Sequence, residues 1–208
     1  GKVVAQALVE ITGVNGSTIR LSPGAAGTRT QQLKGNVRRG LYHQTDATAC
    51  EAIIKSNEMR RGSDGIAGGG IYFADSVEAT LHKAHNMGFV FETRVKLGNV
   101  DEWPGAKVDR SVTFQNLYQK GFDSVHVPRN GGHEYIVYSK DQVKLLRVRK
   151  LRGGLRAGNA AHNHGNWSYD GDWLAVSDLR KNMRALQLFI GGDPAGAQAA
   201  IGGGGGGG

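Results

Sequence analysis

Residues 70–97 read GIYFADSVEATLHKAHNMGFVFETRVKL, and this stretch predicts a short strand, a helix and a longer strand in succession. The letters IYFA have the composition of a compact buried strand. Asp75 or Ser76 can cap the helix that follows, and Gly88 is a natural residue to end it. FVFETRVKL at 89–97 alternates between apolar and polar side chains, which predicts a strand.

Shorter segments elsewhere show the same kinds of pattern. We expect further strands at 3–11, 17–21, 41–45, 122–127, 134–138 and 143–148, helices at 47–56, 114–121 and 178–189, and loops at 22–40 and 99–112. Several short strands, few helices and no regular alternation of strand and helix predict an α+β fold.

The chain divides by composition into three parts. Residues 1–39 are a β-rich flank, in which Asn15-Gly16 is a good hairpin turn and a loop follows. Residues 40–150 carry balanced charge and regular patterns, and we expect one folded domain there. Residues 151–208 are rich in glycine, and we expect a flexible tail with one helix at 178–189.

Composition narrows the class of protein. The 208 residues include one cysteine, Cys50, so an internal disulfide framework is excluded and an intracellular location, cytoplasmic or nuclear, is expected. No run of about 18 apolar residues occurs, so we expect no membrane span. The net charge is +8, and one basic cluster comprises Lys144, Arg147, Arg149, Lys150, Arg152 and Arg156.

Two readings of this basic cluster stay open. Its charges can neutralise the phosphates of a nucleic acid, or they can form a solvated surface that promotes solubility. No aromatic residue interleaves with the cluster along the sequence, so the pattern does not indicate a platform on which single-stranded bases stack.

The loop GSDGIAGGGIYF at 62–73 contains three consecutive glycines before a strand. Its backbone N–H groups can face a phosphate, or the loop can be a mobile surface segment. The loop lacks the Gly-Lys-Ser/Thr ending of a phosphate-binding loop. Its glycines precede a strand instead of opening a helix, which excludes the dinucleotide-binding motif. Scattered histidines and a single cysteine give no metal-ligand spacing, and no GxSxG motif supports a serine hydrolase.

Three fragments each place one polar group within a strand-like segment: LYHQT at 41–45 with His43, GIYFA at 70–74 with Tyr72, and EYIVY at 134–138 with Glu134. Taken one at a time, His43 is compatible with a core histidine, Tyr72 with a core aromatic and Glu134 with a charge at the start of a strand. In this order, with FETRVKLGNV and GFDSVHVP between them, residues 40–150 resemble the catalytic domain of the poly(ADP-ribose) polymerase family. That family comprises diphtheria-toxin-like ADP-ribosyltransferases with a His–Tyr–Glu triad.

The resemblance implies an ADP-ribosyltransferase fold of mostly antiparallel split β-sheets with a few short helices. It also implies roles for single residues. His43 would hydrogen-bond the adenosine-side ribose of NAD⁺, and the backbone of Gln44 would hold the nicotinamide carboxamide, with Thr45 beside it. Tyr72 would stack on the nicotinamide ring, and Thr80 stands where the family has a serine that binds the carboxamide. Glu134 would be the catalytic carboxylate, and Arg60 or Arg61 would contact the diphosphate.

The chemistry of these implied roles is coherent. Cleavage of the nicotinamide–ribose bond passes through an oxocarbenium-like state, which a nearby carboxylate stabilises. The same carboxylate can act as the base that activates the acceptor. A carboxamide needs a paired donor and acceptor, which the backbone of one residue supplies whatever its side chain. This explains why glutamine is tolerated at position 44, where the family commonly has glycine.

The chain also departs from the family pattern. Lys83 stands where the family often has a second tyrosine over the nicotinamide, so His82 or His85 substitutes for it or the pocket is more open. Residues 1–40 are β-rich and loop-like, so we expect them not to form the helical regulatory domain of some members. The segment between Leu97 and Phe114, which helps to receive the acceptor in the family, is short and leaves the acceptor undetermined. The shortness of the whole domain favours transfer of a single ADP-ribose.

The resemblance therefore implies a monomeric enzyme that takes NAD⁺ as substrate, needs no metal and transfers ADP-ribose to a protein or nucleic-acid acceptor. Three alternatives remain: a module that binds NAD⁺ or ADP-ribose without turnover, an NAD⁺ glycohydrolase, and a nucleic-acid-binding protein with a vestigial enzyme core. A different member of the same fold, the RNA 2′-phosphotransferase, has a His-His-Arg type of signature that differs from the motifs here.

Overall fold

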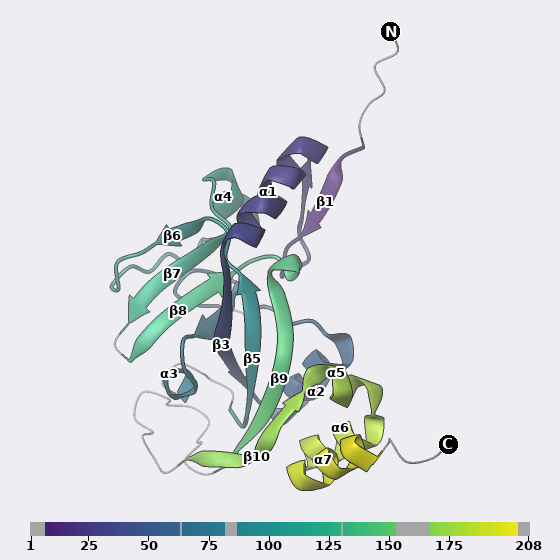
Figure 1. The fold of residues 1–208 in the computed structure, drawn as a ribbon. Coiled ribbons are helices and arrows are strands. Elements are labelled where there is room, and N and C mark those ends of the chain that lie inside the picture. The colour runs from purple at the N-terminus through teal and green to yellow at the C-terminus, as the bar shows by residue number, and fades with distance from the viewer. Residues whose placement is uncertain (1–6, 63, 82–86, 130, 153–166, 204–208) are drawn as a thin grey trace. The chain divides into compact units, whose positions relative to one another are not determined.

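The structure is a computed structural model that describes residues 7–62, 64–81, 87–129, 131–152 and 167–203. It has an α+β fold with one mixed, mostly antiparallel sheet of eight strands, a separate two-stranded hairpin and several short helices (Figure 1). The expected α+β class is therefore confirmed. The eight strands follow the order β10-β9-β5-β3-β4-β8-β7-β6 in a single hydrogen-bonded sheet, where split sheets were expected.

The strands are β1 (Val9–Thr12), β2 (Thr18–Leu21), β3 (Val37–Thr45), β4 (Ile71–Ala74), β5 (Phe89–Lys96), β6 (Val100–Glu102), β7 (Ser124–Arg129), β8 (Gly132–Val137), β9 (Val143–Arg152) and β10 (Ser168–Ala175). The helices are α1 (Pro23–Gly35), α2 (Ala47–Ser56), α3 (Val77–Leu81), α4 (Phe114–Gln119), the 3₁₀ turn η1 (Lys140–Gln142), α5 (Val176–Lys181), α6 (Met183–Gly191) and α7 (Pro194–Gly202).

Helices and turns with local capping signals lie where the sequence predicts them. Helix α2 begins after Asp46, whose side chain accepts a hydrogen bond from the backbone N–H of Ala49 at 2.8 Å. Helix α4 ends next to Gly121, which has a φ of 87° that favours glycine. The hairpin of β1 and β2 turns at Asn15-Gly16 as expected, and its register places Val9 opposite Leu21.

The chain forms two compact units. The first comprises Gly1–Arg39, Met59–Tyr72 and Val95–Lys144, and the second comprises Gly40–Glu58, Phe73–Arg94 and Leu145–Gly208. A cluster of buried apolar side chains in the first unit includes Ala67, Val125, Ile136 and Tyr138. The second unit has its own cluster, which includes Val77, Leu81, Val90 and Leu151.

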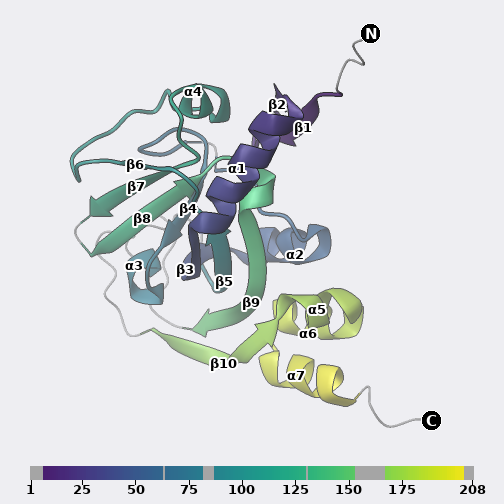
Figure 2. The ribbon, with the colours of Figure 1, turned by 45° about the horizontal axis from the view of Figure 1, so that its top comes forward.

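Residues 22–40 are not the loop that the sequence predicted, because helix α1 occupies most of this range. Ser22 caps the helix by accepting a hydrogen bond from the N–H of Ala25, and Pro23 stands at its first turn. Figure 2 shows α1 beside the hairpin of β1 and β2. Three glycines and scattered polar residues interrupt the apolar periodicity of this segment, so its sequence pattern does not predict a helix.

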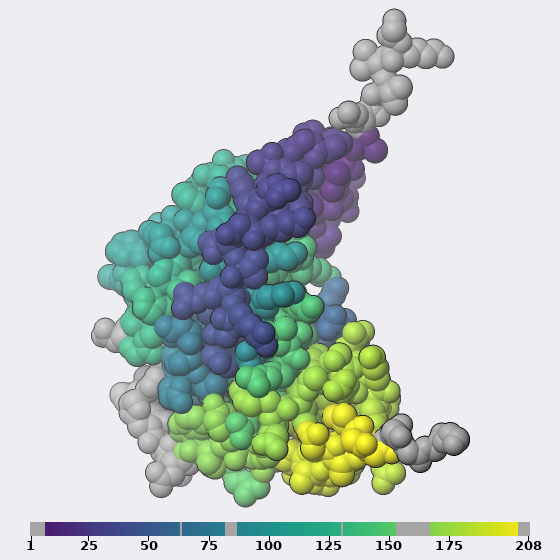
Figure 3. All heavy atoms as spheres, in the orientation of Figure 1, coloured from purple at the N-terminus to yellow at the C-terminus, as the bar shows by residue number. Residues whose placement is uncertain are grey.

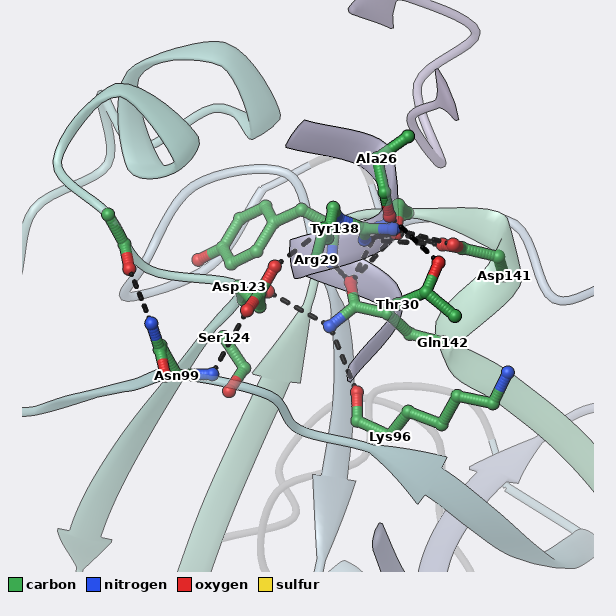
Figure 4. A network of polar contacts seen from close by, with 12 residues as sticks. Ala26, Arg29, Thr30, Lys96, Asn99, Asp123, Ser124, Tyr138, Asp141 and Gln142 are labelled. Carbon is green, nitrogen blue, oxygen red and sulfur yellow. Dashed lines mark hydrogen bonds and ion pairs between the residues drawn. The ribbon is translucent and has the colours of Figure 1, made fainter. Parts of the chain in front are cut away.

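A buried arginine holds α1 in place. Arg29 is 2% exposed, and its guanidinium forms ion pairs with Asp141 at 2.6 Å and Asp123 at 3.3 Å, with a further hydrogen bond to Ser139 (Figure 4). The Nε of Arg29 and Oδ1 of Asp123 lie at ion-pair distance without hydrogen-bond geometry, so charge alone compensates them. This long-range network explains why a sequence with weak helical periodicity forms a helix here.

Burial and hydrogen bonds shift the pKa values of Asp123 and Asp141 in opposite directions. Burial raises the pKa of Asp123 above its usual value, although a backbone N–H of Asn99 and Arg29 oppose the shift. Burial acts in the same sense on Asp141, but hydrogen bonds from Arg29 and Ser139 outweigh it and lower the pKa of that carboxyl. Asp141 is therefore the more readily ionised of the two acids that pair with Arg29.

Residues after 151 also differ from the expected tail with one helix. Strand β10 pairs with β9, and three helices follow it, α5, α6 and α7, of which the expected helix at 178–189 overlaps two. These segments, coloured yellow-green to yellow, form a continuous part of the surface in Figure 3. Asn182 and Asp193 cap α6 and α7, and Phe189 packs against Phe89 with ring centroids 5.3 Å apart. The expected flexible stretches at 153–166 and 204–208 lie outside the described residues.

The segments 99–112 and 76–87 also differ from the prediction or are described only in part. The range 99–112, predicted as a loop, contains the short strand β6, which pairs in parallel with β7. Helix α3 is described only to Leu81, and the remainder of the helix expected up to Gly88 falls largely on residues 82–86, outside the described part.

Candidate active site

The residues singled out from the sequence belong to both units. Tyr72, Glu134, Arg60 and Arg61 lie in the first unit, and His43, Gln44, Thr45 and Thr80 lie in the second.

Tyr72 is a half-buried residue of β4 whose hydroxyl is tied to the glycine loop. The hydroxyl donates to the carbonyl of Gly68 at 2.8 Å and accepts from the N–H of Ala67 at 2.9 Å. Burial raises the pKa of Tyr72 to about 12, and the negative charge of Glu134 adds to the rise. The hydroxyl therefore stays protonated at neutral pH and holds the loop, while the ring packs beside the apolar cluster of the first unit.

The glycine loop is closely packed from Ala67 to Gly70, which argues against a mobile surface loop for that part. Ala67 is fully buried, and a Cβ on Gly68 would lie 2.1 Å from the carbonyl oxygen of Val112. A Cβ on Gly70 would lie 2.4 Å from the side chain of Ile136. Glycine is therefore required because neighbouring strands and loops approach the backbone closely.

Most of the loop N–H groups are used within the protein. The N–H groups of Gly62, Gly68 and Gly70 donate to carbonyl groups of the same loop. Those of Gly65 and Ala67 donate to Asp64 and to Tyr72. The structure therefore gives little support to the phosphate cradle considered from sequence.

Glu134 lies in β8, directly opposite Val127 of β7. Its side chain is 13% exposed, and Oε2 is 3.7 Å from Nε of Arg129 at the end of β7. The contribution of its charge to the pKa of Tyr72 indicates that Glu134 and Tyr72 are electrostatic neighbours. Sequence analysis identified the carboxylate but missed Arg129, because only the tight hairpin of β7 and β8 brings the two together.

Arg60 and Arg61 are exposed residues ahead of the glycine loop. Arg61 folds back on the loop, since a Cβ on Gly69 would lie 2.1 Å from its Nη1. Arg110 pairs with Asp64 at 2.5 Å in the same neighbourhood, and its charge acts on Tyr72. Arg61 and Arg110 therefore both lie against the glycine loop, and Asp64 neutralises the charge of Arg110.

His43 lies in β3 of the second unit and is half-buried, with its ring centroid 6.0 Å from that of Phe73. Gln44 and Thr45 follow it and are 5% and 4% exposed. Gln44 Nε2 donates to Oγ1 of Thr80 in α3 at 2.6 Å. The structure thus brings together Gln44 and Thr80, the two residues to which the resemblance assigns the carboxamide. Lys83, His82 and His85 lie outside the described residues.

The basic cluster on β9 is largely paired with acids. Arg147 pairs with Glu92, and Lys150 and Arg152 pair with Asp170 at 3.2 and 2.6 Å. These pairs reduce the charge that the cluster presents to a partner. Arg156 lies outside the described residues.

Aromatic side chains from another strand accompany this cluster, although none interleaves with it along the sequence. Arg149 lies over Tyr169 at 3.7 Å from the ring centroid, and Arg147 lies over Trp173 at 4.8 Å. Strand β10 supplies both rings, and its antiparallel pairing with β9 places them there. The contacts are intramolecular cation–π interactions, so they stabilise the β9–β10 pair.

Another cluster that the sequence analysis missed lies on β6, β7 and β8. His126 contacts Glu102 through Nδ1, and its Nε2 is 2.8 Å from Nδ1 of His133. Its ring also stacks on Tyr135 with centroids 4.5 Å apart. Within the described ranges, no group of three or more His, Cys, Asp or Glu side chains is arranged to hold a metal ion.

Neither a scan against models of known protein families nor a search of curated proteins yields a match to this chain. Among the helices of the described residues, none has both the length and the apolar character to cross a membrane.

Proposed function

We propose that the chain is an NAD⁺-dependent ADP-ribosyltransferase that transfers single ADP-ribose units to a macromolecular acceptor and releases nicotinamide. In this proposal the α+β sheet is an ADP-ribosyltransferase fold, and His43, Tyr72 and Glu134 form the triad. The observation that carries the proposal is Glu134, a largely buried carboxylate held in a strand as an electrostatic neighbour of Tyr72.

The reaction assigns a separate task to each group. The bond between the nicotinamide nitrogen and ribose C1′ breaks, and its electron pair leaves with neutral nicotinamide. Glu134 stabilises the positive charge that develops on the ribose. The acceptor then attacks C1′, and its proton passes to Glu134 or to solvent. Tyr72 supplies an aromatic face for the nicotinamide ring, with its hydroxyl held on the loop.

The remaining roles concern binding. Gln44 and Thr80 would bind the nicotinamide carboxamide, with Thr45 beside them, and His43 would bind the adenosine-side ribose. Arg60 and Arg61 would contact the diphosphate, which the position of Arg61 against Gly69 supports. The acceptor is a protein or a nucleic acid, and the pairing of Arg147 and Arg152 with acids weakens the case for the latter.

The test follows nicotinamide release and transfer of label from NAD⁺ labelled in its adenylate part, for the wild type and Glu134→Gln. We expect the variant to bind NAD⁺ and to lose about a hundredfold or more of the release rate, because the charge is removed and the shape kept. Glu10→Gln, an exposed residue paired with Arg20, is the matched control. Normal turnover by Glu134→Gln would refute the role of this carboxylate.

A second candidate function is binding of NAD⁺ or ADP-ribose without turnover. The ion pair of Arg129 with Glu134 favours it, because a paired carboxylate is less available to a developing cation. Binding of NAD⁺ with no nicotinamide release would support this candidate. Glutamate-dependent release without label on a macromolecule would instead support an NAD⁺ glycohydrolase.

A further inference from the structure

Gln44 and Thr80 form a buried side-chain pair within the second unit. Gln44 projects from β3 and Thr80 from α3, and both are more than nine-tenths buried. Their hydrogen bond joins Nε2 of Gln44 to Oγ1 of Thr80 at 2.6 Å. This short bond connects the two residues assigned to carboxamide binding.

The proton count determines which end of the amide meets Thr80. The Thr80 hydroxyl has one proton, and it donates that proton to the carbonyl of Val77 at 2.5 Å. The hydroxyl oxygen can therefore only accept from Gln44, so the amide nitrogen must face it and the amide oxygen must point away.

The amide oxygen of Gln44 accepts no hydrogen bond from Thr80 in this arrangement. Oε1 is buried and has no hydrogen-bond partner within the described part of the chain. A buried acceptor without a partner costs free energy, so this side chain is only half satisfied where it lies. Such a side chain is readily displaced by a group that bonds more completely.

The side chain of glutamine ends in a primary carboxamide, the same functional group that nicotinamide carries. We propose that the carboxamide of Gln44 competes with the carboxamide of the ligand for Thr80, and that Gln44 thereby sets the affinity for the nicotinamide end of NAD⁺. The inference rests on the proposed function. Binding turns Gln44 away from Thr80, and the ligand carboxamide takes its place. Residue 44 thus determines affinity through its side chain in addition to its backbone.

The experiment titrates benzamide, a primary carboxamide on an aromatic ring, against the wild type and Gln44→Ala. We expect benzamide to bind about threefold to tenfold more tightly to the variant, which corresponds to one neutral hydrogen bond no longer in competition. The KM for NAD⁺ should fall in the same variant. Gln31→Ala, the same substitution at an exposed position of α1, should change neither quantity.

Two further measurements make the result specific. Benzoate has the same ring but no N–H donor, and its binding should not improve in Gln44→Ala. In a Thr80→Val background, Gln44→Ala should no longer affect benzamide, because the group for which both carboxamides compete is gone. Gln44→Leu, which keeps the volume and removes the amide, replaces the alanine variant if that variant does not fold.

Unchanged or weaker benzamide binding by a folded Gln44 variant would overturn the inference. The proposed function is judged separately, because glutamate-dependent release of nicotinamide by the wild type supports it whatever Gln44→Ala does. A wild type that neither binds benzamide nor releases nicotinamide would overturn both.

Discussion

Two buried glutamines, Gln142 and Gln44, differ in how completely their amides are bonded. Oε1 of Gln142 accepts from the N–H groups of Tyr138 and Ser139, and its Nε2 donates to the carbonyls of Lys96 and Asp123 (Figure 4). Gln44 makes one hydrogen bond and leaves its oxygen without a partner.

The difference separates a buried polar group that is fully hydrogen-bonded from one that makes a single hydrogen bond. Gln142 connects the backbone of several segments of the first unit, so any displacement would break several hydrogen bonds. Gln44 can leave its position at the cost of a single bond. The number of hydrogen bonds that a buried polar side chain makes therefore distinguishes positions that maintain the fold from positions that can exchange partners.

The largest effect on stability is expected from Gln142→Leu. The change leaves two buried N–H groups and two carbonyls without their partner, and we expect a loss of about 4 kcal/mol or more. Urea denaturation measures the free energy of unfolding. A loss below about 1 kcal/mol would contradict the structural role of Gln142.

Tyr72→Phe should have the next largest effect, because the ring remains and the hydroxyl is lost. The N–H of Ala67 and the carbonyl of Gly68 lose their partner, so we expect a loss of about 2 kcal/mol. Tyr118→Phe on α4 is the matched control, with an expected change within about 0.5 kcal/mol. If both variants were equally stable, the hydroxyl of Tyr72 would not hold the loop.

Asp141→Asn should change how stability depends on pH. The pKa of Asp141 is lowered in the folded state, so its contribution is present above the usual carboxyl pKa and is lost as pH falls through the lowered value. The variant should be less stable than the wild type at pH 7, and the gap should narrow below about pH 4. Thermal unfolding between pH 7 and pH 3 measures it, and a gap that widens on acidification would refute the assignment.

Gln44→Leu should have the smallest effect on stability. It removes one hydrogen bond and also one buried oxygen without a partner, so we expect a change within about 1 kcal/mol in the free energy of unfolding. Gln142→Leu, the same substitution at the other buried glutamine, is its natural counterpart. Equal losses in the two variants would remove the distinction between the two residues.

The sequence predicted a large part of the fold where the signals are local. The cap at Asp46 and the glycine at 121 placed α2 and α4, alternation placed β5, and a strongly β composition placed β8. Helix α1 and strand β10 escaped prediction, because their stabilising contacts come from residues elsewhere in the sequence. Arg29 is the clearest case, since its partners Asp123 and Asp141 lie about a hundred positions away.

The candidate site divides in the same way. The sequence alone determined which side chains are available and in which order, including His43, Tyr72 and Glu134. A sequence motif depends only on the identity of the residues and their order along the chain. The tertiary structure decided what each polar atom bonds. It tied the Tyr72 hydroxyl to the glycine loop, placed Arg129 beside Glu134 and joined Gln44 to Thr80. Hydrogen bonds and ion pairs depend on positions a few ångströms apart, and only the packing of strands and helices brings such distant residues that close.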